Sequence, residues 1–161
     1  VELFGGMPDY HKLLKLKKKY SFKLISDSAQ SYGSKYNKKT IGNLVDVACL
    51  SFFPTKVLGC YGDGGALLTN KKNIAKKMKS LTQHGRGKTK YDNIHVGYNS
   101  RLDTLQAAIL MNKMSLIKNE IKNRRNIALY YNKYLESKNV SILEYEKKVF
   151  SSYGYYTFIC K

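Results

Sequence analysis

Apolar and polar positions along the chain switch repeatedly between two periods, which predicts an α/β fold. Short apolar runs indicate strands. The run 45–53 is apolar almost throughout and is closed by Pro54, as is typical of a strand buried on both faces of a parallel sheet. Longer stretches with apolar residues three or four positions apart indicate helices. We expect strands at 22–26, 45–53, 66–69, 140–143 and 155–160, and helices at 8–20, 71–83 and 103–136.

Capping residues set the expected helix boundaries. Asn70 is expected to cap the helix over 71–83, and Gly85 stands where a C-terminal cap is expected. Asp103 is expected to cap the long helix, with Gln106 three residues later as in a capping box. This helix is expected to bury one face, made of Leu105, Ala108, Ile109, Ile117, Ile121 and Ala128.

Composition places the chain among globular proteins. Its 161 residues are 43% hydrophobic and 25% charged, which is enough for about one domain with a real core and argues against extended disorder. The apolar runs fall short of the ~18 residues that span a bilayer, and no basic segment precedes an apolar stretch at the start, so we expect neither a membrane contact nor a signal peptide. The cysteines, Cys49, Cys60 and Cys160, have no metal-ligand spacing, and we expect reduced core thiols in a cytoplasmic protein without a metal.

The charge balance is strongly basic, with 29 basic against 11 acidic residues and a net charge of +18. Such an excess is typical of nucleic-acid-binding proteins. Here it is spread over nearly every expected helix, and four of the basic residues are Arg, the residue best suited to phosphate contacts. The abundant Lys, Asn, Ile and Tyr share A/T-rich codons, so genome composition is a sufficient explanation. We expect no nucleic-acid partner and leave open that the charge attracts an anionic substrate.

Two polar side chains directly follow expected strands, where open parallel sheets bind their ligands. Asp27 follows the strand at 22–26, although a turn or cap aspartate is the commoner interpretation of that residue alone. Lys56 follows the buried strand and Pro54. A desolvated lysine has a lowered pKa and can attack a carbonyl, but surface exposure is the usual fate of lysine.

Other reaction classes have no support in the sequence. The glycine-rich segment 59–65 has neither the P-loop pattern nor the dinucleotide-binding one, and we expect it to be a tight loop near the lysine turn. The three histidines have no metal-ligand spacing, and neither a nucleophile elbow nor a glycosidase-like carboxylate pair is present.

Five segments in order carry a resemblance to a known family. They are ISDSAQ (25–30), SFFPTK (51–56), GCYGDGGA (59–66), HG (84–85) and GYNSRLDTLQAA (97–108). The series resembles the DegT/DnrJ/EryC1/StrS family of sugar-nucleotide aminotransferases, which are pyridoxal phosphate (PLP) enzymes of fold type I. The resemblance runs over nearly the whole chain and implies a mostly parallel large-domain sheet followed by the start of a small α+β domain.

The resemblance also implies a division of the chain. Residues 1–100 would be the rear portion of the PLP-binding large domain, 101–136 the long connecting helix, and 137–161 the beginning of the small C-terminal domain. The chain covers less than half of a typical member, without the upstream part that normally cradles the phosphate and stacks on the cofactor. We therefore expect the isolated 161 residues to bind PLP poorly and to have no turnover.

Four residues would hold the cofactor if the family's roles transfer. Lys56 would be the catalytic residue and bind PLP as a Schiff base, and Asp27 would pair with the pyridine nitrogen. Gln30 would approach the ring hydroxyl, and Ser51 would donate to the phosphate. A carboxylate favours the protonated ring nitrogen that stores electrons best, and a lysine, unlike an arginine, can shuttle a proton.

Two further residues would act across a homodimer with shared active sites, as the family implies. Asn99 would reach the phosphate in the partner subunit's site. Arg101 would hold a substrate carboxylate there by bidentate pairing.

The implied reaction transfers an amino group from glutamate to a keto-sugar nucleotide, for the synthesis of amino sugars and surface polysaccharides. Some family members dehydrate sugars and carry His in place of the lysine, so Lys56 argues for transamination. Segments 99–110 and 152–157 most resemble members acting at C3 of a UDP-linked 3-keto uronic-acid sugar. Members acting at C4, of the perosamine type, often show His near position 155, where this chain has Tyr155. The alternatives are a C4 aminotransferase and an inactive relic or basic binding protein.

Overall fold

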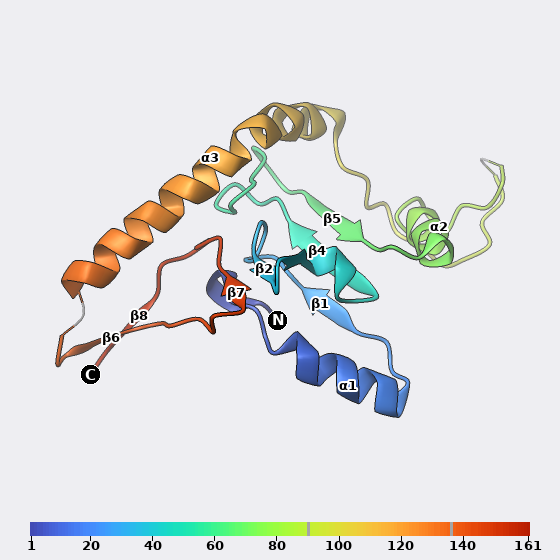
Figure 1. Cartoon of the computed structure of the whole chain (residues 1–161). Helices are drawn as coiled ribbons and strands as arrows, with labels where there is room; N and C mark the ends of the chain where they lie inside the picture. The colour runs from blue at the N-terminus through green and yellow to red at the C-terminus, as the bar shows by residue number, and fades with distance from the viewer. Residues whose placement is uncertain (90, 136) are drawn as a thin grey trace.

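The computed structural model describes residues 1–89, 91–135 and 137–161, which form small sheets spanned by one long helix (Figure 1). The alternation of strands and helices confirms the predicted α/β class. The helices are α1 (Tyr10–Tyr20), α2 (Lys72–Leu81) and α3 (Thr104–Leu135), with short 3-10 turns at Leu3–Gly5 and Ile41–Asn43. The strands are β1 (Ile25–Asp27), β2 (Lys35–Tyr36), β3 (Lys39–Thr40), β4 (Val47–Ser51), β5 (Gly65–Leu68), β6 (Val140–Ile142), β7 (Val149–Phe150) and β8 (Phe158–Cys160).

The sheet that orders the predicted site residues has the strand order β1-β4-β5. Strands β1 and β4 are parallel, with Asp27 opposite Cys49, so both carboxyl ends meet at the same edge of the sheet. Strand β5 returns antiparallel to β4, with Ser51 opposite Gly65. The loop between β4 and β5 therefore leaves and re-enters the sheet at that same edge.

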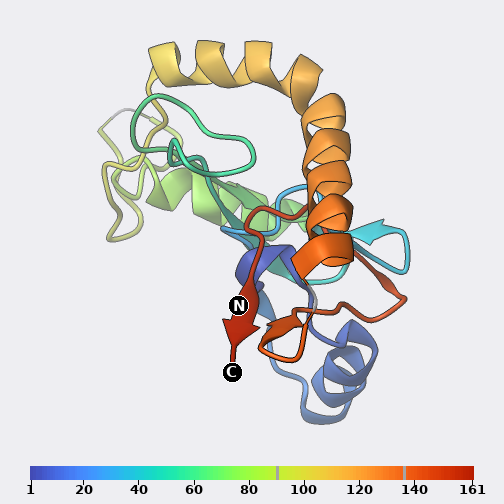
Figure 2. The ribbon, with the colours of Figure 1, turned by 90° about the vertical axis from the view of Figure 1, so that its left-hand side faces the viewer.

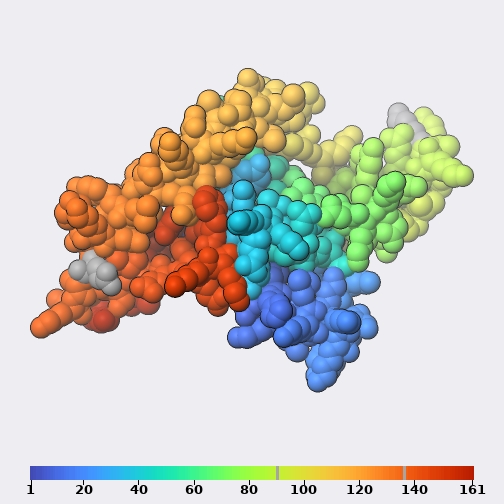
Figure 3. All heavy atoms as spheres, in the orientation of Figure 1, coloured from blue at the N-terminus to red at the C-terminus, as the bar shows by residue number. Residues whose placement is uncertain are grey.

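The C-terminal strands divide between two places. Strand β7 pairs with β2, with Phe150 opposite Lys35, whereas β6 and β8 pair with each other. Residues near the C-terminus thus lie against the first third of the chain, and Figure 3 shows the red C-terminal residues between the orange part of α3 and the cyan residues. The two-residue strands β2, β3 and β7 escaped the sequence analysis because two residues show no alternation.

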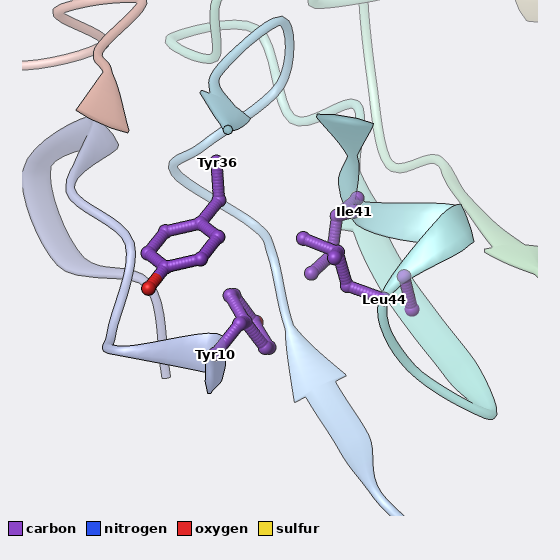
Figure 4. Packing of buried hydrophobic residues seen from close by; sticks show 5 residues of the cluster. Tyr10, Tyr36, Ile41 and Leu44 are labelled. Carbon is purple, nitrogen blue, oxygen red and sulfur yellow. The ribbon is translucent and has the colours of Figure 1, made fainter. Parts of the chain in front are cut away.

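The apolar core consists of two clusters. In the first, Tyr10 of α1 and Tyr36 of β2 meet edge to face at 5.8 Å between ring centroids, beside Ile41, Leu44 and Ala48 (Figure 4). The second lies beneath the first half of α3 and contains Phe52, Leu58, Cys60 and Leu110. One cluster thus fixes α1 against the sheet, and the other fixes α3 over the loop between β4 and β5.

Helix boundaries differ from the prediction where side chains find other partners. The Asp9 side chain caps α1 by accepting a hydrogen bond from the Lys12 amide at 3.2 Å. The prediction that Asn70 caps α2 is wrong, because its amide donates to the Gly42 carbonyl at 2.9 Å and Lys71 occupies the N-cap position. Gly85 has the expected left-handed backbone, with a φ of +75°, and donates to the end of α2.

Helix α3 follows its predicted range, except that Glu136, where the prediction ends, lies outside the described residues. Figure 2 shows the helix bending between its yellow and orange parts. Asn112 and Ser115 donate to carbonyls of the preceding turn, which is a contact that bends helices. Ala128 is buried as predicted, but Leu105 is 70% exposed, so the predicted buried face is wrong at the start of the helix. Among the described residues, no helix is long and apolar enough to cross a membrane.

Candidate active site

Asp27 and Ser51 end the two parallel strands and lie at the same edge of the sheet. The Asp27 carboxylate is exposed and accepts a hydrogen bond from the Ala29 amide at 3.1 Å. The Ser51 hydroxyl is half-buried and accepts from the Phe53 amide at 3.3 Å. Both side chains are oriented by the turn that follows their own strand and keep further hydrogen-bonding capacity.

Gln30, in the turn after β1, contacts residues near both ends of the chain, Phe4 and Gly154. Its side-chain oxygen accepts from the Phe4 amide at 2.8 Å. Its backbone lies against Gly154, where an added Cβ would stand 2.7 Å from the Gln30 carbonyl oxygen. Since real Cβ atoms do not approach this closely, the contact requires glycine at 154.

Lys56 lies in the loop that connects β4 to β5. Its amide donates to the Phe53 carbonyl at 2.9 Å, and its ammonium lies 5.7 Å from the centroid of the Tyr155 ring. Glycine is required at 59, where a Cβ would meet the Pro54 carbonyl oxygen at 2.6 Å. Lys113 of α3 donates to the Gly59 carbonyl at 2.6 Å. The glycine-rich segment is therefore the predicted tight loop, and α3 holds it in place.

The four predicted cofactor residues lie at or after the carboxyl ends of adjacent parallel strands. Asp27 ends β1 and Gln30 follows it, whereas Ser51 ends β4 and Lys56 follows it. Gln30 and Lys56 both contact the C-terminal segment, at Gly154 and Tyr155. The set offers a carboxylate, an amide, a hydroxyl and an amine at or after one edge of the sheet.

Asn99 and Arg101 lie elsewhere in the chain. Both are exposed, and the Arg101 guanidinium donates to the Asn99 side-chain oxygen at 3.3 Å. Their segment is pinned to the end of α2 by a bond from the Tyr98 amide to the Leu81 carbonyl at 2.7 Å. Arg101 lines a cleft of about 940 Å³ between β5 and α2, and Asp27, Gln30, Ser51 and Lys56 are not among the residues that line it.

A buried acid that the sequence analysis did not single out lies beside Asp27. The Glu2 side chain is 1% exposed, and its carboxylate accepts hydrogen bonds from the hydroxyls of Tyr10, Ser26 and Ser31. The Glu2 amide also donates to the Asp27 carbonyl at 3.0 Å. Burial, followed by the bond to Glu2, raises the pKa of Tyr10 above its ordinary value.

Tyr155, like Glu2, contacts a predicted site residue and was not itself predicted as a site residue. Hydrogen bonding from Thr55 is the main cause that lowers the pKa of Tyr155, and the charges of Lys56 and Arg124 act in the same direction. These partners lie about 30 and 100 positions away in the chain, so no local sequence signal could have identified the group.

One cysteine agrees with the predicted core position, one agrees in part and one does not. All three cysteines, each within the described residues, are free, and Cys60 is buried in the cluster beneath α3. Cys49 is partly buried, and burial followed by the nearby Asp27 charge raises its pKa. Cys160 is exposed in β8, so the prediction that it is a core thiol is wrong.

Comparison with known proteins gives one consistent result. The model of the DegT/DnrJ/EryC1/StrS aminotransferase family matches residues 1–161. The UDP-2-acetamido-2-deoxy-3-oxo-D-glucuronate aminotransferase of Pseudomonas aeruginosa is 42% identical over 157 residues, which are 98% of this chain and 44% of that protein. The dTDP-3-amino-3,6-dideoxy-alpha-D-galactopyranose transaminase of Aneurinibacillus thermoaerophilus is 44% identical over 137 residues, covering 85% of this chain and 38% of that protein.

A solved structure agrees with these relatives. The crystal structure of a DegT DnrJ EryC1 StrS aminotransferase from Brucella abortus matches with a TM-score of 0.94 and 38% identity, over 99% of this chain and 43% of that one. The chain thus spans less than half the length of the relatives it matches.

Proposed function

This chain belongs to the DegT/DnrJ/EryC1/StrS aminotransferase family, and on that premise we propose that the whole protein is a PLP-dependent sugar-nucleotide aminotransferase. The observation that carries the proposal is the set of four polar groups after β1 and β4, at the edge where α/β sheets bind their ligands. The amino group would come from glutamate, and the acceptor would be a keto-sugar nucleotide for amino-sugar synthesis.

The donor set fits PLP, the cofactor on which the aminotransferases of this family depend. PLP presents an aldehyde, a ring nitrogen, a ring hydroxyl and a phosphate. The amine of Lys56, the carboxylate of Asp27, the amide of Gln30 and the hydroxyl of Ser51 match these groups one to one. When bound, PLP supplies an electron sink for the carbanion that forms beside the reacting nitrogen.

Lys56 is the residue that we assign to proton transfer. Its half-buried primary amine would carry the cofactor and, once free, would take up the proton of the donor carbon at Nζ and pass it to the cofactor carbon. It would move a proton in the opposite direction when the acceptor reacts. A guanidinium could not do this because it stays protonated.

Asp27 would control the charge of the cofactor ring. A carboxylate within hydrogen-bond distance favours the protonated form of a ring nitrogen. The bond from the Ala29 amide fixes one carboxylate oxygen and leaves the other for a ligand. Gln30 would orient the ring through its hydroxyl, and Ser51 would orient the phosphate.

Asn99 and Arg101 would act in the site of a second subunit of a homodimer. The exposure of both residues, and the place of Arg101 on a cleft that Lys56 does not line, support a role outside this chain's own site. Arg101 would bind a substrate carboxylate in a bidentate way, and its bond to Asn99 holds the two side chains together.

For the substrate we favour amination at C3 of a UDP-linked 3-keto uronic-acid sugar. The Pseudomonas relative is named for such a 3-oxo substrate, and the Aneurinibacillus relative for a 3-amino sugar. Tyr155 stands where C4 members often have His, and a C4 aminotransferase is the alternative. The net charge of +18 is the observation that favours the second alternative, a basic binding protein without catalysis.

Location and domain division complete the proposal. We infer a cytoplasmic enzyme, which the three free thiols favour because disulfides are rare in that compartment. Residues 1–100 would be the rear of the cofactor domain, 101–136 its connecting helix and 137–161 the start of the small domain.

The test uses the complete polypeptide encoded by the gene, incubated with PLP and then reduced with borohydride. We expect the cofactor to be trapped on the peptide that contains Lys56, with a visible absorption band that Lys56→Ala abolishes and the control Lys72→Ala keeps. Product analysis with 3-keto and 4-keto UDP-sugars would then identify the aminated carbon. Trapping on another lysine would refute the assignment.

A further inference from the structure

The ring of Tyr155 lies beside the amine of Lys56, although the two residues are far apart in the sequence. The distance from Lys56 Nζ to the ring centroid is 5.7 Å, within the range in which an aromatic face attracts a cation. Tyr155 is half-buried and belongs to neither of the two apolar clusters of the described residues. Filling the core therefore does not explain its place.

The backbone around Tyr155 is fixed on two sides. An added Cβ at Gly154 would stand 2.7 Å from the Gln30 carbonyl oxygen and 3.2 Å from Val57 Cγ2, so the segment fits closely between the turns after β1 and β4. Arg124 of α3 donates to the Gly154 carbonyl at 3.4 Å and to Glu120 at 3.1 Å. These contacts restrict the position of the Tyr155 ring over Lys56.

The charged groups around the Tyr155 hydroxyl act in the same direction. Thr55 and Lys56 come from the loop after β4, and Arg124 comes from α3. The Thr55 hydrogen bond first, and then the two cations, lower the pKa of Tyr155. These surroundings therefore favour negative charge on the phenol oxygen beside the Lys56 ammonium.

From this geometry we propose that Tyr155 is the positioning residue of Lys56: its ring and hydroxyl hold the amine toward the carboxyl ends of β1 and β4. The inference rests on the proposed function and adds a residue to which the comparisons assign no role. Lys56 must bind the cofactor, release it and then move a proton at Nζ. A free lysine chain has many rotamers, and a group that holds the released amine keeps it near the reacting carbon.

Three variants of the complete polypeptide test this role. Tyr155→Phe removes the hydroxyl and keeps the ring, whereas Tyr155→Leu removes both. Gly154→Ala leaves Tyr155 intact and displaces its backbone. The matched control is Tyr20→Leu, because Tyr20 is exposed and has the Lys19 ammonium 5.0 Å from its ring in α1.

We expect Tyr155→Leu to lower kcat about 50-fold with KM changed less than about 2-fold, since misplacing a catalytic group by about 1 Å costs on the order of 100-fold. The dissociation constant for PLP, measured on the apoprotein by fluorescence, should rise about 5-fold, as the loss of a cation–π contact implies. Gly154→Ala should resemble Tyr155→Leu, and Tyr20→Leu should match the unaltered protein.

Tyr155→Phe separates positioning from packing, because it keeps the shape of the side chain. We expect kcat to fall about 5-fold, the effect of one lost hydrogen bond. One ionisation should also disappear from the alkaline limb of its pH profile. This variant decides the matter if Tyr155→Leu does not fold.

Two results would overturn the inference. One is unchanged kcat and PLP affinity in Tyr155→Leu, and the other is a Tyr155→Phe pH profile identical to that of the unaltered protein. Lys56→Ala distinguishes this failure from failure of the proposed function. If Lys56→Ala abolishes cofactor trapping and the Tyr155 variants change nothing, only the role of Tyr155 is refuted.

Discussion

Two regions of the molecule use similar polar groups but differ in exposure to solvent. The Glu2 cluster, formed by Glu2, Tyr10, Ser26, Ser28 and Ser31, is closed, whereas the Lys56 site is open. The two regions meet at the end of β1, where Ser26 belongs to the cluster and Asp27 to the site. Three hydroxyls satisfy the Glu2 carboxylate, which is 1% exposed. The Asp27 carboxylate is exposed, with the Ala29 amide as its neighbour in the turn. A carboxylate closed in by donors stabilises the fold, whereas one that keeps free acceptor positions can bind a ligand.

Sequence position alone does not separate these two roles, because Ser26 and Asp27 are neighbours. Alternation along β1 turns Ser26 toward Glu2 and leaves Asp27 on the other side. A substitution can therefore alter one region without the other, and the variants below test the comparison in this way.

The largest expected effect is on the open side. Lys56→Ala should lower transamination by about 10⁴-fold, because the general acid–base residue is removed. The midpoint of urea unfolding of the apoprotein should stay close to that of the unaltered protein, since a half-buried lysine contributes little to the core. Steady-state rates and urea titrations measure the two effects, and a large loss of stability would contradict the division.

The sealed side should show the opposite pattern. Glu2→Ala removes the acceptor shared by three buried hydroxyls, and we expect a loss of about 3 kcal/mol in the free energy of unfolding. Glu2→Gln keeps the shape and should lose about 1 kcal/mol. Urea unfolding measures both variants, and kcat per folded molecule should remain within about 2-fold. A loss of kcat without a loss of stability would instead assign Glu2 to the Lys56 site.

Asp27→Asn sharpens the boundary between the two regions. The amide keeps the volume and the turn but cannot favour a protonated ring nitrogen, so kcat should fall about 100-fold. The free energy of unfolding should change by less than about 0.5 kcal/mol, as expected for an exposed position. Measuring kcat and urea unfolding on the same variant tests both expectations.

Acid should weaken the fold through the buried Asp46, and this is the smallest effect. The Leu24 amide, Lys17 and Lys71 surround Asp46, and these hydrogen bonds lower the pKa of Asp46. A lowered pKa means that the stabilisation is complete above the ordinary value near 4 and is lost as the pH falls below it. From this group, urea midpoints should change little between pH 7 and pH 4 and fall below pH 4 for the unaltered protein, with a smaller fall for Asp46→Asn.

The sequence predicted the elements that carry their own periodicity and missed the contacts that depend on distant partners. Strand β4 followed from an apolar run and Pro54, and α3 followed from its long helical pattern. Leu105 was expected to be buried, but the chain supplies little cover at that end of the helix.

The residues of the candidate site show the same difference between local sequence signals and distant contacts. Asp27 and Lys56 were proposed because each follows an expected strand, which is a local signal reinforced by the family resemblance. Tyr155 and Glu2 acquire their environments only when segments about 100 and about 25 residues apart meet, and no periodicity encodes such a meeting.

The grip of α3 on both the lysine loop and the C-terminal segment has a mechanical consequence. Its first half holds Gly59 through Lys113, and its second half holds Gly154 through Arg124. The helix therefore connects the loop of Lys56 to the segment of Tyr155. A shift of α3 would displace both segments together, so that the amine and the phenol would keep their relative position.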